Sequence, residues 1–162
     1  FNMIDSQLGI ISNVSLYMGD FTFKEFEAFT EEQKESYLAD RGHNLVVDNG
    51  LQQIILLMIA NNTNSFTLCG VGSGTTTPIS TDTALGTSIG TNTINSRYRV
   101  GNIAYFNTFF GKNDNNGTWA ETGIFTAGSV LLCRRKYDTV FTKDTSKAAV
   151  ISWTITLTAT AD

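Results

Sequence analysis

The chain has 162 residues and a mass of 17.7 kDa, which fits one domain that can bury a hydrophobic core without disulfide or metal support. Charged residues make up only 16%, whereas 23 threonines and 14 asparagines favour strands and tight turns and exclude a collagen, a coiled coil or a disordered acidic tail. The net charge of -4 argues against a nucleic-acid partner, and no run of about 18 apolar residues predicts a membrane span.

The first 44 residues are predicted to form an N-terminal arm, separate from a β-sandwich domain over residues 45–162. Thr30 resembles a helix N-cap, with acids in the first turn, so a short helix is expected to run to about Asp40. The same segment contains four aromatic residues within nine positions: Phe21, Phe23, Phe26 and Phe29. Aromatic side chains at this density need a surface to pack against, which is either the domain's own core or a neighbouring subunit.

A short strand at residues 45–47 is expected to lead into a helix from Gly50 to about Ala60, with Asp48 as its cap. The helix is apolar on nearly all sides, which predicts that it is largely buried. A strand at residues 66–71 follows.

Residues 72–90 then form a long neutral loop. Because a loop of this length usually has a function, Thr75, Thr76 and Thr77 are candidate contact residues.

The second half of the chain is predicted to be entirely β. Strands are expected at residues 97–110, 118–125, 130–137 and 148–159, and the last alternates strictly between apolar and hydroxyl side chains. Asn115, Asn116 and Gly117 form a hairpin turn, whose tip is a second candidate contact. Trp119 and Trp153 are predicted to be structural. The expected fold is a mainly β, antiparallel, jelly-roll-like sandwich with one buried helix and a short N-terminal helix.

No segment predicts catalysis, a metal site or a cofactor. The glycine-rich stretch at residues 70–76 lacks the lysine and the following helix of a phosphate loop, and His43 is the only histidine. Glu121 is interpreted as a structural, buried partner of Arg97, Arg99 or Arg134. A glycosidase acid is the less favoured alternative.

Two further groups of residues are given structural interpretations. Cys69 and Cys133 each lie in an apolar run and are expected to be reduced core residues, although a disulfide between them stays open. The basic run Arg134-Arg135-Lys136 is interpreted as a solvated strand end rather than a binding patch.

Several short segments, in this order, resemble small structural proteins of tailed bacteriophages. Two departures are visible: no acid–arginine pair follows Leu85, and residues 1–44 have no counterpart in the pattern. The segments are Asp48-Asn49-Gly50-Leu51, Gly72-Ser73-Gly74-Thr75-Thr76-Thr77-Pro78, Asp82-Thr83-Ala84-Leu85, Glu121-Thr122-Gly123-Ile124-Phe125, Leu131 to Arg134, and Trp153-Thr154-Ile155-Thr156.

The resemblance implies a non-enzymatic virion protein that forms oligomers and contacts other virion proteins, with no catalytic residues. A capsid decoration (cement) or head-fibre-base protein is the first expectation. The alternative is a tail-fibre, baseplate or receptor-binding component that contacts a host surface glycan through residues 72–90 and the 113–117 tip.

Overall fold

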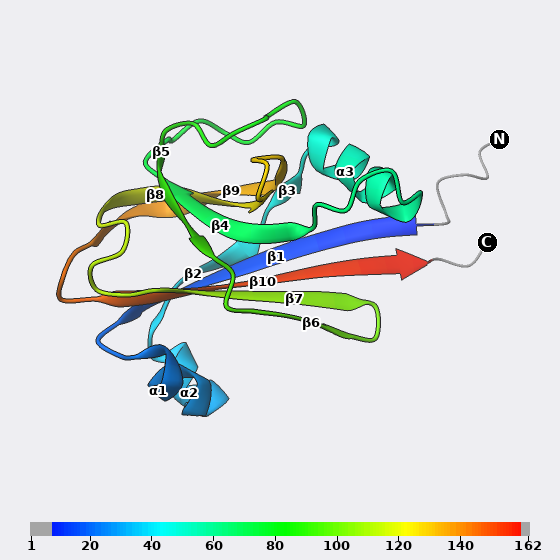
Figure 1. Cartoon of the computed structure of the whole chain (residues 1–162). Coiled ribbons are helices and arrows are strands. Elements are labelled where there is room, and N and C mark those ends of the chain that lie inside the picture. The colour runs from blue at the N-terminus through cyan, green and yellow to red at the C-terminus, as the bar shows by residue number, and fades with distance from the viewer. Residues whose placement is uncertain (1–7, 160–162) are drawn as a thin grey trace.

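Two five-stranded antiparallel sheets face each other in a computed structural model that describes residues 8–159 (Figure 1). Sheet A has the strand order β2-β1-β10-β7-β6, and sheet B has the order β3-β9-β8-β4-β5. The antiparallel β-sandwich is thereby confirmed, while its jelly-roll likeness stays a prediction. The strands are β1 (Leu8–Gly19), β2 (Leu38–His43), β3 (Leu45–Val46), β4 (Phe66–Gly72), β5 (Ser88–Thr93), β6 (Ser96–Val100), β7 (Ile103–Phe110), β8 (Gly117–Thr126), β9 (Leu131–Lys143) and β10 (Ala148–Ala159).

The core lies between the sheets and is built by the period-two alternation of the long strands. On β10, Ile151, Trp153 and Ile155 are buried between the sheets, while the intervening Ser152 and Thr154 lie on the outer face of sheet A. Trp119 on β8 packs edge-on against Phe110, with ring centroids 5.1 Å apart. Both tryptophans therefore have the structural place that was predicted for them.

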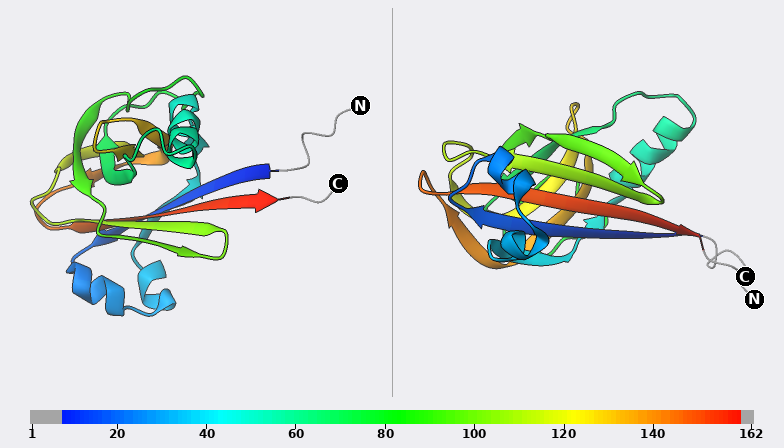
Figure 2. Two further views of the ribbon diagram at one scale, coloured as in Figure 1. Left: turned by 45° about the vertical axis from the view of Figure 1, so that its right-hand side comes forward. Right: turned by 90° about the horizontal axis from the view of Figure 1, so that it is seen from below.

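Residues 8–44 are not a separate arm, which corrects the predicted boundary at residue 44. Strand β1 pairs with β10 from Leu8 to Gly19 and with β2 on its other side, so it lies inside sheet A. The two helices that follow it, α1 (Phe23–Ala28) and α2 (Glu31–Glu35), cover one end of the outer face of this sheet (Figure 2). The N-terminal segment is thus part of the sandwich.

The N-terminal aromatics pack onto the protein's own sheet. Phe21 and Phe26 are buried with Tyr17 and Val150, and the Phe23 ring lies 5.6 Å from Phe109. Of the two partner surfaces considered, the domain's own core is the one found. The predicted cap is also correct, because the Thr30 hydroxyl accepts the Gln33 N–H.

The second N-terminal helix is shorter than expected, and the first was not predicted. Helix α2 ends at Glu35 instead of near Asp40, because the chain pairs with β1 from Leu38 onward. Cross-strand pairing therefore overrides the helical pattern. Helix α1 was missed because it has only six residues, although Thr22 and Glu25 form a capping box at its start.

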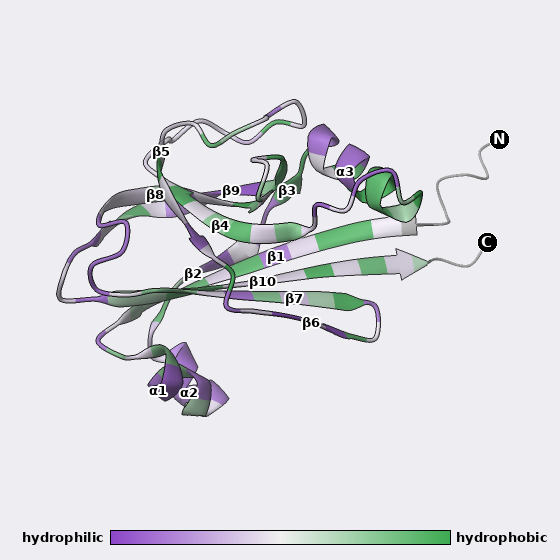
Figure 3. Ribbon diagram, viewed as in Figure 1, coloured by the Kyte–Doolittle hydropathy of each residue, from purple (hydrophilic) through white to green (hydrophobic). Residues whose placement is uncertain are grey.

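Helix α3 (Asp48–Met58) is not largely buried, contrary to the prediction. Only Gly50 and Gln53 are buried along it, and its N-cap is Val47 rather than Asp48. Gly50 allows the helix to approach the β9 backbone at Leu132, which a Cβ atom at that position would meet. One side of α3 thus packs on the sandwich, and its apolar second half is coloured green in Figure 3.

The strands of the second half differ from the prediction in three places. Strand β5 begins at Ser88, inside the predicted loop of residues 72–90, and continues to Thr93. The run 97–110 is a hairpin rather than one strand, because Gly101, with φ of +55°, turns the chain between β6 and β7. Strand β9 continues to Lys143, beyond the predicted end at Tyr137. The turn before β8 has Asn115 and Gly117 at positive φ, but it is not the predicted hairpin turn, because it connects β7 of sheet A with β8 of sheet B and these two strands do not pair.

The two cysteines are free and buried. Cys69 on β4 and Cys133 on β9 both pair with Ile124, which lies on the strand between them. Two strand spacings, roughly 10 Å, separate their backbones, which exceeds the reach of a disulfide. Burial raises the pKa of the Cys69 thiol to about 11, and it raises the pKa of Cys133 still further.

Candidate functional site

The outer face of sheet A carries two rows of polar side chains that cross four strands. The register places Tyr98, Tyr105, Thr154 and Asn13 side by side from β6 to β1. The second row lies two residues further along each strand, on the same face, and consists of Ser96, Asn107, Ser152 and Ser15. Adjacent strands lie about 4.8 Å apart, so each row is roughly 14 Å long. Most of these side chains are half-buried.

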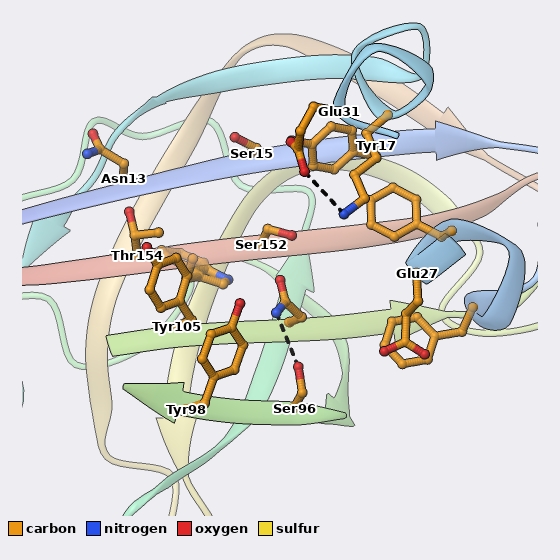
Figure 4. A pocket seen from close by; sticks show the side chains of 15 residues that line it. Asn13, Ser15, Tyr17, Glu27, Glu31, Ser96, Tyr98, Tyr105, Ser152 and Thr154 are labelled. Carbon is orange, nitrogen blue, oxygen red and sulfur yellow. Dashed lines mark hydrogen bonds and ion pairs between the residues drawn. The ribbon is translucent and has the colours of Figure 1, made fainter. Parts of the chain in front are cut away.

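Helices α1 and α2 form a wall along this floor, and together they enclose a groove of about 530 Å³ (Figure 4). Phe23, Phe26, Glu27, Glu31 and Lys34 line the helical side. The wall is held by the buried aromatic cluster around Phe26, in which the Tyr17 ring lies 5.1 Å from the Phe26 ring. The volume lies within the range of small-ligand sites in proteins.

At the edge of the sheet the groove ends in a stacked pair of tyrosines. The rings of Tyr98 and Tyr105 are almost parallel, at 6°, and their centroids are 4.8 Å apart. Tyr98 is 52% exposed, and β6 is the last strand of the sheet. An aromatic surface therefore meets solvent directly beside a polar floor.

Several polar groups of the groove are held in place by neighbours. Asn107 donates its amide N–H to the Ser96 hydroxyl at 3.1 Å, and Arg41 donates to the Ser15 hydroxyl at 3.0 Å. The Lys34 ammonium pairs with Glu31 at 3.6 Å. Glu27 adds a second carboxylate, so the lining residues carry more negative than positive charge.

Glu121 lies away from this groove, in the interior beneath the long loop of residues 73–87. Its carboxylate accepts the Arg134 Nε–H at 3.0 Å and the backbone N–H groups of Gly74, Gly86 and Thr87. The interpretation as a buried ion-pair partner is confirmed, with Arg134 as the partner. The Glu121 side chain is fully buried and its oxygens are occupied, so it cannot reach a glycan as a general acid.

The basic run is not a solvated strand end, which corrects another prediction. Arg134 and Arg135 are both buried. Arg135 forms two hydrogen bonds to the Asp40 carboxylate, at 2.7 and 3.0 Å. Burial alone would lower the pKa of Arg135, but the hydrogen bonds and charge of Asp40 outweigh it and raise that pKa. The run of basic residues suggested a solvated surface, but a buried arginine is tolerated where a carboxylate pairs with it.

The predicted contact residues of the two loops do not join the groove. Thr75, Thr76 and Thr77 are exposed on the 73–87 loop, where the Thr76 carbonyl accepts a hydrogen bond from Arg134. Asn115 bonds to Asn92 within the fold, and Asn116 accepts from Lys143. Of the four aromatic residues predicted to make contacts, Phe23 and Phe26 line the groove.

The groove itself was missed in the sequence, although one signal for it was present. The alternating hydroxyls of the last strand predicted a polar outer face, and Ser152 and Thr154 lie there. Tyr98, Tyr105 and Asn13 could not be added, because only the register shows that they lie beside Thr154.

Within residues 8–159, no helix is long and apolar enough to cross a membrane. The same residues contain no group of three or more histidine, cysteine, aspartate or glutamate side chains that could hold a metal ion. No protein-family model matches the chain, and no curated protein or solved structure is detectably similar to it.

Proposed function

We propose that this chain is a non-enzymatic structural protein of a tailed-phage virion, and that it acts as a capsid decoration (cement) or head-fibre-base protein. Its partners would be the major capsid protein and further copies of itself. The family part of the proposal comes from the sequence pattern, and one feature of the structure supports an assembling role.

The observation that carries the proposal is an apolar stripe on the outer side of α3. Ile55, Met58 and Ile59 are 55%, 78% and 64% exposed, and Leu51 continues the stripe one turn earlier. These positions follow the i, i+4, i+7, i+8 spacing of one helical face, whereas Ile54 and Leu57 pack on the core. A helix that is apolar on both sides but covered on one fits a protein whose second side is covered by a neighbouring subunit.

Four of the six segments of the phage-like pattern also meet in one place. The Glu121 carboxylate accepts the backbone N–H of Gly74. Arg134 donates to the Thr76 carbonyl and pairs with Asp82 at 3.0 Å. A Cβ atom at position 74 would collide with the Glu121 carboxylate, so this stretch needs glycine. The pattern thus corresponds to a rigid scaffold, which supports a structural role for Glu121.

The alternative function is a tail-fibre, baseplate or receptor-binding component. The groove on sheet A favours it, because its exposed tyrosine and polar floor face solvent on the side opposite sheet B. In both cases the chain would be located in the virion.

Sedimentation with expanded empty capsids tests the first proposal. The wild-type protein should pellet with the capsids at a saturating, stoichiometric ratio, and an Ile55→Ser/Met58→Ser/Ile59→Ser variant should stay in the supernatant. A Val140→Ser variant, which changes an exposed apolar residue on β9, serves as the matched control and should pellet normally. Failure of the wild-type protein to pellet, together with binding to host cells, would favour the alternative.

A further inference from the structure

We propose that the groove on the outer face of sheet A binds a neutral oligosaccharide, with one sugar ring stacked against the Tyr98–Tyr105 pair. The proposal deepens the alternative function above by naming its site and ligand class. It does not depend on where in a virion the chain is located.

The tyrosine pair supplies the apolar contact that a sugar ring requires. The C–H groups on one face of a pyranose carry partial positive charge and are attracted to the electron-rich face of an aromatic ring. Tyr98 is held by its near-parallel stack on Tyr105, so binding would immobilise little additional side-chain freedom. As Tyr98 lies on the edge strand and half of it is exposed, a ligand can approach it from solvent.

The floor supplies the hydrogen bonds that the sugar hydroxyls require. Asn13, Ser15, Ser152 and Thr154 present short hydroxyl and amide groups, each of which can donate and accept. In Figure 4 their side chains lie over neighbouring strands on the same side of the sheet as Tyr98 and Tyr105. Short side chains on a paired sheet are already ordered, which favours recognition of a rigid polyhydroxylated ligand.

The charges around the groove select a neutral ligand. Glu27 and Glu31 lie on the helical wall, and Lys34, the cation of the lining set, is paired with Glu31. A carboxylate accepts hydrogen bonds from sugar hydroxyls, but it repels sialic acid, uronic acid or a sulfated sugar. Exclusion of anionic glycans is therefore part of the proposal.

The test uses the purified chain and defined sugars, without phage particles, so its failure leaves the virion proposal untouched. A panel of neutral hexasaccharides (cello-, malto-, chito-, manno- and xylo-oligosaccharides) and one anionic hexamer, oligogalacturonate, is titrated into ¹⁵N-labelled protein. We expect saturable amide shifts with at least one neutral sugar, confined to β1, β6, β7, β10 and the α1–α2 wall. The anionic hexamer should produce none.

Three variants then assign the contact. Tyr98→Ala should weaken binding at least tenfold, whereas Tyr98→Phe, which keeps the ring, should stay within about threefold of the wild type. Val100→Ala changes a similarly exposed residue on the same strand and should bind normally. Melting temperatures of all three verify that the fold is kept.

The absence of saturable shifts with every neutral sugar would overturn the proposal. Equal binding by wild-type protein and a folded Tyr98→Ala variant would also overturn it, as would a preference for the anionic hexamer.

Discussion

The carboxylate of Glu121 and the guanidinium of Arg134 lie 3.0 Å apart on adjacent strands, and their side chains are 0% and 2% exposed. Through this pair, the long neutral loop is attached to sheet B, because Glu121 also accepts N–H groups from both ends of the loop. A loop that looked free in sequence is thus fixed by one buried charge.

Replacing Glu121 by Gln should destabilise the protein by about 3 kcal/mol. The substitution keeps the shape but leaves a buried Arg134 with only the partly exposed Asp82 as a counter-charge. Urea unfolding monitored by tryptophan fluorescence measures the change. Glu31→Gln, at an exposed carboxylate, should stay within about 0.5 kcal/mol of the wild type. An unchanged urea midpoint for Glu121→Gln would show that the carboxylate does not stabilise the loop.

Removal of residues 1–43 should abolish the fold. The deletion takes away β1 and β2, so β10 keeps β7 on one side but loses β1, its partner along its whole length on the other side. Circular dichroism should then show no cooperative melting transition.

A point variant separates the aromatic cluster from the strands. Phe26→Ala removes a buried ring and should cost about 3 kcal/mol while keeping cooperative melting. A cooperatively melting deletion protein would show instead that the N-terminal segment is dispensable.

The native cysteines should be inert to alkylation at pH 8. Both are buried, and burial raises the pKa of Cys69 from its ordinary 9.0 to about 11. The reagent therefore cannot reach the sulfur atoms, and at pH 8 the Cys69 thiol is not in the reactive thiolate form. Iodoacetamide should add no mass to the native protein and two adducts after unfolding in urea. Rapid labelling of the native protein would contradict the packing.

The same thiols make stability fall at alkaline pH. The folded thiol keeps its proton in the range where the unfolded cysteine loses it. The contribution of the protonated thiol to the free energy of unfolding is therefore complete below pH 9. It is lost as the pH rises toward 11, where the free energy of unfolding falls by on the order of 2 kcal/mol. A Cys69→Ala/Cys133→Ala variant should show a shallower decline. Identical slopes for the two proteins would show that the thiols do not contribute.

A serine substitution should affect stability differently on the two faces of α3. Ile55→Ser changes the exposed stripe and should leave the free energy of unfolding within about 0.5 kcal/mol. Ile54→Ser changes the neighbouring residue that packs on the core and should cost about 2 kcal/mol. Urea midpoints compare them directly, and equal losses would mean that both faces are covered.

Sequence patterns predicted the sandwich because its strands depend on local alternation. The last strand shows this best, since Trp153 and Ser152 lie on the faces that the alternation assigns to them. Local alternation could not predict which residues far apart in the sequence would contact each other. Asp40 and Arg135 are 95 residues apart, and nothing local indicates that they form a buried pair. The same holds for the groove, which exists only through the pairing of β6, β7, β10 and β1. The apolar residues of α3 were identified, but periodicity does not distinguish a core from a surface covered by a partner.

The central claim, that the chain is a structural component of a virion, is tested most directly by the protein composition of purified particles. Gradient-purified particles of the phage proposed to encode this chain are digested, and the chain is quantified against the major capsid protein by isotope-labelled peptides. The account predicts that it bands with the particles in a fixed ratio corresponding to many copies per particle. Recovery only from the soluble lysate, with none in the particle band, would contradict it.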